Sequence, residues 1–100
     1  MVAAREYRLH TLAWREVDEA DVWYLSRDYD TSVEFLSDLD AALEAISDAP
    51  QRWPKYLHGT RRFVMQRFPF SVVYLDGPEF IAIVAVAHSK RRPGYWKGRL

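Results

Sequence analysis

The stretch that decides the fold reads FSVVYLDGPEFIAIVAVAH, from Phe70 to His88. Two runs rich in Val, Ile, Phe and Tyr, residues 70–75 and 80–88, flank a DGPE segment at 76–79. Strand-forming runs on either side of a short Gly-Pro turn predict a β-hairpin. The second run is apolar at nearly every position, which is typical of a central strand covered on both faces. The sequence therefore predicts a sheet with residues 80–88 at its centre.

Two helices are expected before this sheet. Apolar residues recur at helical spacing across residues 12–27, with carboxylates between them, and again from Thr31 to Pro50. Thr31 followed by Glu34 predicts a capping box at the start of the second helix, after a break at residues 28–30. So short a connection predicts an antiparallel helical hairpin whose apolar stripes need a sheet to cover them.

Two further short strands complete the expected order of elements. Apolar and polar side chains alternate over residues 6–11, and a β-rich run covers residues 62–66, before a break at Phe68-Pro69. The order is therefore β-α-α-β-β-β. We expect an α+β fold in which the helical hairpin packs on a small, mainly antiparallel sheet, as a single domain over residues 1–100.

Composition excludes several kinds of site. The chain has no cysteine, which excludes disulfides, thiolate nucleophiles, iron–sulfur clusters and zinc sites with cysteine ligands. Its three histidines lack the spacing of metal ligands, and its four glycines form neither a phosphate loop nor a dinucleotide fingerprint, so we expect no metal and no cofactor. No apolar run is long enough to span a membrane, and charged residues interrupt the N-terminus before a signal sequence can form, so a cytoplasmic protein is expected.

Charge is divided unevenly along the chain. The net charge is zero, but residues 1–50 carry four arginines against twelve carboxylates, and residues 51–100 carry ten basic groups against two carboxylates. The first half thus has a charge of −8 and the second of +8, which predicts an acidic layer and a basic layer with different partners. The alternative is that the two halves attract each other and that each solvates its own outer face; the helical carboxylates in particular fit a solvated face.

The basic second half interleaves arginines with aromatic residues. Arginine forks suit phosphate oxygens, and aromatic faces stack on unpaired bases, so this pattern is typical of a surface that handles RNA. The residues concerned are Arg61, Arg62, Arg67, His88, Lys90, Arg91, Arg92, Tyr95, Trp96, Lys97 and Arg99.

Two of these residues have a structural alternative. His88 is expected on one strand face with Val84 and Val86, at the end of the central strand, where a histidine can act as a general acid or base. Alternatively, His88 is half-buried and orders the tail that follows it. Trp96 either contacts a target or packs the tail onto the sheet, as C-terminal indoles often do.

Two strings carry a family resemblance: RFPFSVVY, from Arg67 to Tyr74, and AVAHSKRRPGYW, from Ala85 to Trp96. Together they resemble the RelE/ParE toxin superfamily of type II toxin-antitoxin modules, and they look closer to the ParE-like branch. The string DAPQRWP at residues 48–54 also looks like the family's stretch before its first sheet arginine. The resemblance implies the β-α-α-β-β-β fold and a toxin that a cognate antitoxin wraps and neutralises. A heterotetramer with the antitoxin is one assembly that fits.

The resemblance leaves three functions open. A ParE-like toxin poisons DNA gyrase without a catalytic constellation, and the target-binding residues would then be Arg61, Arg62, Arg91, Arg92 and Trp96. A RelE-like toxin is a metal-independent endoribonuclease that cuts mRNA on the ribosome, and its catalytic residues would then be His88, Tyr95 and Arg67, with Arg61 or Arg62 as a further phosphate clamp. The third reading is an inactive relative that only binds an antitoxin. Zero net charge and only three lysines favour gyrase over the ribosome.

An antitoxin needs a place to dock. We expect an exposed apolar patch of at least a few hundred Å² on the isolated toxin, because patches of this size mark interaction sites. A groove between the helical hairpin and the sheet would suit an antitoxin helix.

Overall fold

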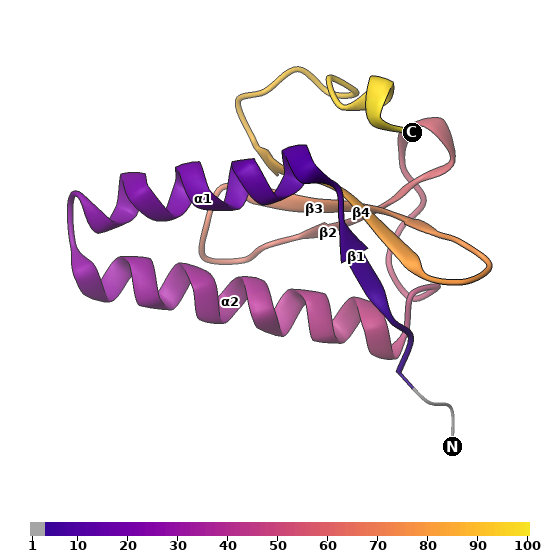
Figure 1. The fold of residues 1–100 in the computed structure, drawn as a ribbon, viewed down its shortest axis with the longest axis horizontal. Helices are drawn as coiled ribbons and strands as arrows, with labels where there is room; N and C mark the ends of the chain where they lie inside the picture. Colours follow the sequence, from indigo (N-terminus) through magenta and orange to yellow (C-terminus); the bar gives the residue numbers. More distant parts are fainter. Residues whose placement is uncertain (1–3) are drawn as a thin grey trace.

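The computed structural model describes residues 4–100 and confirms the expected order of elements (Figure 1). The strands and helices are β1 (Tyr7–Leu9), α1 (Thr11–Leu25), α2 (Tyr29–Asp48), β2 (Arg61–Val64), β3 (Phe70–Asp76) and β4 (Ile81–His88). Single turns of 3-10 helix cover Leu57–Gly59 and Lys97–Arg99. In residues 4–100, no helix is long and apolar enough to span a lipid bilayer.

The four strands form one sheet in the order β1-β4-β3-β2. The β2–β3 and β3–β4 pairs are antiparallel, and β1 is parallel to β4, so the sheet is mainly antiparallel as predicted. The pairing of β1 is brief and reaches only Ile81–Ile83 of β4. Beyond Ile83, the peptide groups on that side of β4 therefore need another partner.

The sheet is covered on both faces. Helices α1 and α2 pack on one face, around Phe35, Ile46 and the strand residues Val72 and Ile83. The C-terminal tail packs on the other face, where Val73, Val84, Ala85 and Trp96 form a second, smaller core. In Figure 1 the tail lies above the sheet and α2 below it. The prediction that the last strand is central and covered on both faces is confirmed.

A β-bulge interrupts the alternation of faces in β4. Val73 pairs with Ala85 and Tyr74 pairs with Ile83, which leaves Val84 without a partner on β3. The extra residue shifts the pattern, so that Val84 and Ala85 both join the core beneath the tail while Val86 joins the core beneath the helices. The prediction that His88 shares a face with both Val84 and Val86 is therefore wrong for Val84.

Both helices begin at caps that hydrophobic spacing did not reveal. The carboxylate of Asp28 accepts from the backbone N–H of Thr31 at 3.2 Å and from its hydroxyl at 2.7 Å, so α2 starts at Tyr29. The predicted capping box of Thr31 and Glu34 is wrong, because the charged side chain of Asp28 caps the positive end of the helix one turn earlier. Nδ1 of His10 accepts from the N–H of Leu12 at 3.0 Å and caps α1, which ends the first strand sooner than expected.

Candidate functional site

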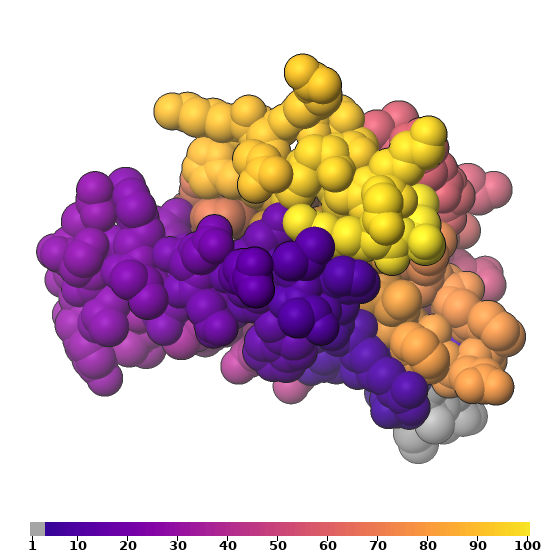
Figure 2. Space-filling view, turned by 45° about the horizontal axis from the view of Figure 1, so that its top comes forward, coloured from indigo at the N-terminus to yellow at the C-terminus, as the bar shows by residue number. Residues whose placement is uncertain are grey.

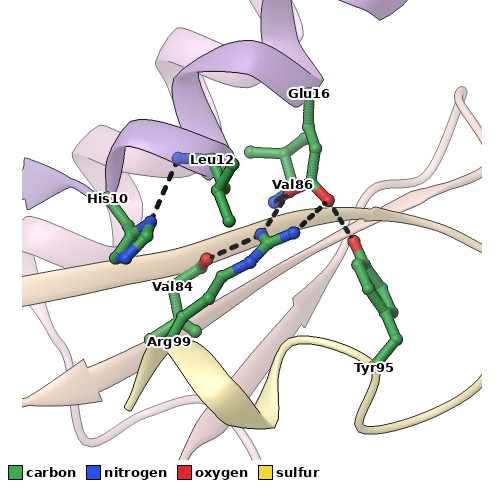
Figure 3. Close-up of polar contacts among 7 residues, drawn as sticks. All are labelled: His10, Leu12, Glu16, Val84, Val86, Tyr95 and Arg99. Carbon is green, nitrogen blue, oxygen red and sulfur yellow. Dashed lines mark hydrogen bonds and ion pairs between the residues drawn. The ribbon is translucent and has the colours of Figure 1, made fainter.

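A single carboxylate, that of Glu16 on α1, ties down the C-terminal tail (Figure 3). The guanidinium of Arg99 forms a bidentate ion pair with this carboxylate, with Nη1 2.9 Å from Oε1 and Nη2 3.1 Å from Oε2. The hydroxyl of Tyr95 donates to Oε2, and the backbone N–H of Val86 donates to Oε1 at 3.0 Å. Figure 2 shows the end of the chain, in yellow, lying against the first turns of α1, in indigo.

This ion pair takes the place of a missing strand. Because β1 reaches only Ile83, the N–H of Val86 and the C=O of Val84 on that edge of β4 have no strand beside them. Glu16 accepts from the first, and Nη1 of Arg99 donates to the second at 3.1 Å. The side chains of Glu16 and Arg99 are only 12% and 11% exposed, and unpaired backbone groups in such surroundings cost free energy. The tail is thus fastened where the sheet would otherwise be incomplete.

The spacing of Glu16 along α1 could have predicted its burial, although its charge suggested an exposed position. Ala13, Val17 and Ala20 are the buried residues of α1, and Glu16 lies three residues after the first and four before the last. Side chains at these spacings share one helix face, so Glu16 belongs to the buried stripe. The interpretation of the helical carboxylates as solvated is therefore wrong for Glu16.

The surroundings of Tyr95 favour the protonated form of its hydroxyl group. Burial, and then its hydrogen bond to Glu16, raise the pKa of the Tyr95 hydroxyl well above its ordinary value. The guanidinium of Arg91 lies over the ring, 3.9 Å from its centroid. A phenol with a raised pKa is both a weaker acid and, at neutral pH, fully protonated. Tyr95 therefore contributes a fixed aromatic surface and is poorly placed for proton transfer.

His88 ends β4 and begins the tail. Its Nδ1 accepts from the N–H of Lys90 at 3.0 Å, and its ring meets that of Phe70 edge-on, with centroids 5.1 Å apart. The side chain is partly exposed. These contacts are those of the predicted alternative in which a half-buried histidine orders the tail.

Two hollows meet at His88, Arg91 and Tyr95. We call the first the helix groove; its volume is about 380 Å³, and it is lined by Glu16, Glu19, Ala20, Trp23, Tyr24, Pro69, Phe70, Val86, His88, Lys90, Arg91 and Tyr95. We call the second the tail cleft; its volume is about 330 Å³, and it is lined by Tyr56, Arg62, Val64, Ser71, Val73, Ala87, His88, Ser89, Arg91, Arg92, Pro93, Tyr95 and Trp96.

The structure gathers most, but not all, of the site residues expected from the sequence. Arg62, Arg91, Arg92, His88 and Tyr95 all line the tail cleft. The other three do not offer a free side chain there. They are Arg61, Arg67 and Trp96.

Each of these three has a structural partner instead. Arg67 pairs with Asp38 of α2 through two contacts of 2.9 Å, and it lines neither hollow. Its hydrogen bonds hold the pKa of the Asp38 carboxyl below its usual value. Arg61 donates from Nη1 to the carbonyl oxygens of Trp53 and Gln51, at 2.7 and 3.2 Å, and so braces the loop before β2.

Trp96 is the clearest correction among the expected contact residues. Its side chain is 1% exposed and packs in the core beneath the tail, so it is not available to touch a target in this structure. The alternative that it packs the tail onto the sheet is confirmed. Burying the large indole stabilises the folded chain, because it removes a large apolar surface from water.

Comparison with known proteins identifies the family. A family model described as the ParE toxin of the type II toxin-antitoxin system, parDE, matches residues 7–93. The chain belongs to the ParE toxin family. Among solved structures, a chain of the chromosomal ParDE TA system from P. aeruginosa is similar to this ParE chain with a TM-score of 0.76 and 14% sequence identity, over 87% of this chain and 98% of that one. No curated protein sequence matches significantly.

Membership of the ParE family implies a cognate antitoxin as partner. The helical hairpin of this ParE chain also leaves several large apolar side chains in contact with solvent, among them Trp23 at 53% exposed beside the helix groove. The others on the two helices are Leu12, Trp14, Val22, Leu25, Tyr29, Val33 and Leu36. An exposed patch of the area expected from the sequence stays a prediction, but the residues that could form one are here.

Proposed function

We propose that this ParE toxin arrests growth by poisoning DNA gyrase. The observation that supports the proposal is that the three residues a nuclease would need are all engaged in contacts within the fold. Tyr95 donates to Glu16 and keeps its proton, His88 accepts from the tail backbone, and Arg67 is paired with Asp38 outside both hollows. General acid–base catalysis needs groups free to exchange protons within reach of one substrate. A toxin that acts by binding has no such requirement.

Pulse-labelling of DNA, RNA and protein synthesis, minutes after induction of the toxin alone, tests this function. We expect DNA synthesis to fall first, and purified toxin to convert gyrase-bound plasmid into cleaved DNA. An early fall in protein synthesis, with cut mRNA, would contradict the proposal and favour the ribosomal nuclease.

A pair of substitutions sharpens the test. His88→Asn with Tyr95→Phe removes both candidate proton-transfer groups, and a nuclease that used them would lose about 100-fold or more in rate for each. The matched control, His10→Asn with Tyr29→Phe, makes the same chemical changes on the helical half; asparagine still caps α1, and Tyr29 is 68% exposed. We expect both double variants to fold and to retain DNA arrest.

We further propose that the antitoxin docks an apolar helix in the helix groove. Trp23, Tyr24 and Phe70 provide an aromatic lining for it, and the flanking helix surface is rich in exposed apolar residues. Such grooves suit the apolar face of an amphipathic helix. Trp23→Ser should weaken antitoxin binding by tenfold or more, on the order of a lost aromatic anchor, whereas Leu100→Ser, at a residue that is 49% exposed and outside the groove, should not. Equal affinity of both variants for the antitoxin, measured by calorimetry, would exclude this groove.

A further inference from the structure

The tail cleft is lined by three arginines that form no ion pair with a carboxylate in the described part of the chain. Arg62 reaches it from β2, and Arg91 and Arg92 reach it from the loop after β4. Within residues 4–100, none of the three has a carboxylate within 4 Å, and no acidic residue lines the cleft. Four other arginines, Arg5, Arg8, Arg67 and Arg99, are paired with carboxylates. An unpaired arginine cluster in a concave site is a place for an anion.

The sheet itself selects which arginine faces the cleft. Arg62 pairs with Val73, a residue of the core beneath the tail, and Arg61 pairs with Tyr74, a residue of the core beneath the helices. Because adjacent residues of a strand point to opposite faces, Arg62 lies on the tail face and Arg61 does not. The acidic helices pack on the opposite face, which separates their charge from the cleft.

Aromatic rings hold two of the guanidinium groups in place. Arg62 lies 4.2 Å from the ring centroid of Tyr56, and Arg91 lies 3.9 Å from that of Tyr95. Stacking on a ring face restrains a guanidinium while leaving its edge N–H groups free to bind phosphate oxygens. Tyr95 is in turn fixed by Glu16, so the cleft is built before any ligand arrives.

The tail loop brings the third arginine to the same cleft. Gly94 has φ +81°, a value that L side chains rarely adopt, and the N–H of Tyr95 donates to the carbonyl of Arg92 at 3.1 Å. This tight turn allows Arg92 and Tyr95 to line one hollow. Ser71 and Ser89 add hydroxyl groups to the lining.

We propose that the tail cleft binds the phosphodiester backbone of a single nucleic-acid strand, with Arg62, Arg91 and Arg92 as its phosphate contacts. Arginines held beside aromatic rings are typical of surfaces that bind single strands, since phosphates take the charge and unpaired bases stack on aromatic rings or on guanidinium planes. The inference deepens the proposed function, on which it rests for the source of the strand: the three arginines contact DNA that gyrase holds, in addition to any contact with gyrase itself.

Binding is measured without gyrase, so that the two proposals can fail separately. The probes are fluorescently labelled single strands of roughly 12 nucleotides, one of DNA and one of RNA with the same sequence, followed by anisotropy. Three phosphate contacts predict a slope of log K against log salt of about −2.1, which corresponds to about 18-fold weaker binding at 200 mM than at 50 mM salt. We expect DNA to bind at least as tightly as RNA, with a Kd on the order of 10–100 μM at the lower salt concentration.

A matched pair of triple variants locates the site. Arg62→Gln, Arg91→Gln and Arg92→Gln together should abolish binding, and each single change should make the salt slope shallower by about 0.7. The control removes the same charge from β1 and α1, by Arg8→Gln, Arg15→Gln and Arg27→Gln, and should bind as the parent does. The single variants keep the test decisive if the cleft triple variant does not fold.

Four results would contradict the inference, in whole or in one of its parts. Absence of binding to either strand at low salt removes the site, and equal losses in the two triple variants reduce it to overall charge. RNA binding without DNA binding would support the cleft but contradict gyrase-held DNA as the source of the strand. Gyrase poisoning that persists unchanged in the cleft triple variant would leave the proposed function standing and exclude a DNA contact as part of it.

Discussion

The contact of Glu16 with the tail makes a sharp prediction about stability. Glu16→Gln keeps the size of the side chain but removes the charge that Arg99 and Tyr95 share. The new amide has one acceptor oxygen, and its NH₂ group faces donors. The side chain of Arg99, which is only 11% exposed, then carries a positive charge with no carboxylate to pair with.

The magnitude follows from the burial of the pair. Removing one partner of a buried ion pair costs about 3–5 kcal/mol, because the remaining charge is left uncompensated. Since both side chains keep about a tenth of their surface in water, we expect the lower end, about 3 kcal/mol. For a chain of this size that corresponds to a fall in Tm of roughly 12–24 °C.

Urea unfolding followed by tryptophan fluorescence measures this loss, with Trp96 reporting on the core beneath the tail. Glu19→Gln is the matched control: it is the same change about one turn later on α1, at an exposed residue, and the stability should stay within about 0.5 kcal/mol of the parent. The double variant Glu16→Gln/Arg99→Met should lose less than the sum of its single changes, with a coupling of about 1 kcal/mol or more. A Glu16→Gln protein as stable as the control, with additive single changes, would refute the role given to this ion pair.

Three further predictions concern other parts of the fold. Trp96→Ala should cost about 3–5 kcal/mol in urea unfolding, because it empties the core beneath the tail, and a loss below about 1 kcal/mol would contradict that packing. Burial raises the pKa of Tyr74 to about 12, so the unfolded chain releases this proton from about pH 10 while the folded chain keeps it. Stability should therefore fall between about pH 10 and 12, and Tyr74→Phe should lessen that slope by up to about 1.4 kcal/mol per pH unit; an unchanged slope would show that Tyr74 does not contribute. Asp38→Asn should leave Tm nearly unchanged, since solvent screens its exposed pair with Arg67, and calorimetry showing a large fall would mean that this contact anchors the β2–β3 turn.

Local patterns predicted the elements of the fold because each pattern reports on a few neighbouring residues. The β-hairpin at residues 70–88 follows from two apolar runs around a turn, and the helical hairpin follows from two apolar stripes with a short break. The boundaries were less predictable. Thr31 and Glu34 match a capping box, but Asp28 also matches a cap, and only the competition between them in the folded chain selects Asp28.

The sequence also predicted part of the candidate site. Arg62, Arg91 and Arg92 were expected on a shared surface, and the tail cleft brings them together. Arg67 was expected with them, but the turn before β3 directs it to Asp38 on the other layer. The direction of a side chain at a turn depends on the path of the whole backbone, which residue spacing does not specify.

The sequence by itself determined the order of strands and helices, the membership of the ParE family, and the division of charge between an acidic helical half and a basic second half. The order of elements and the division of charge follow from the periodicity and composition of contiguous residues, whereas the family follows from particular motif strings and from the family model that matches residues 7–93. Only the tertiary structure decided that Glu16 and Arg99 complete the edge of β4, that a bulge at Val84 changes the faces of the central strand, and that Trp96 is buried. These features join residues up to 83 positions apart, or depend on the register between strands, and their free energies exist only once the sheet has paired and the tail has closed over it.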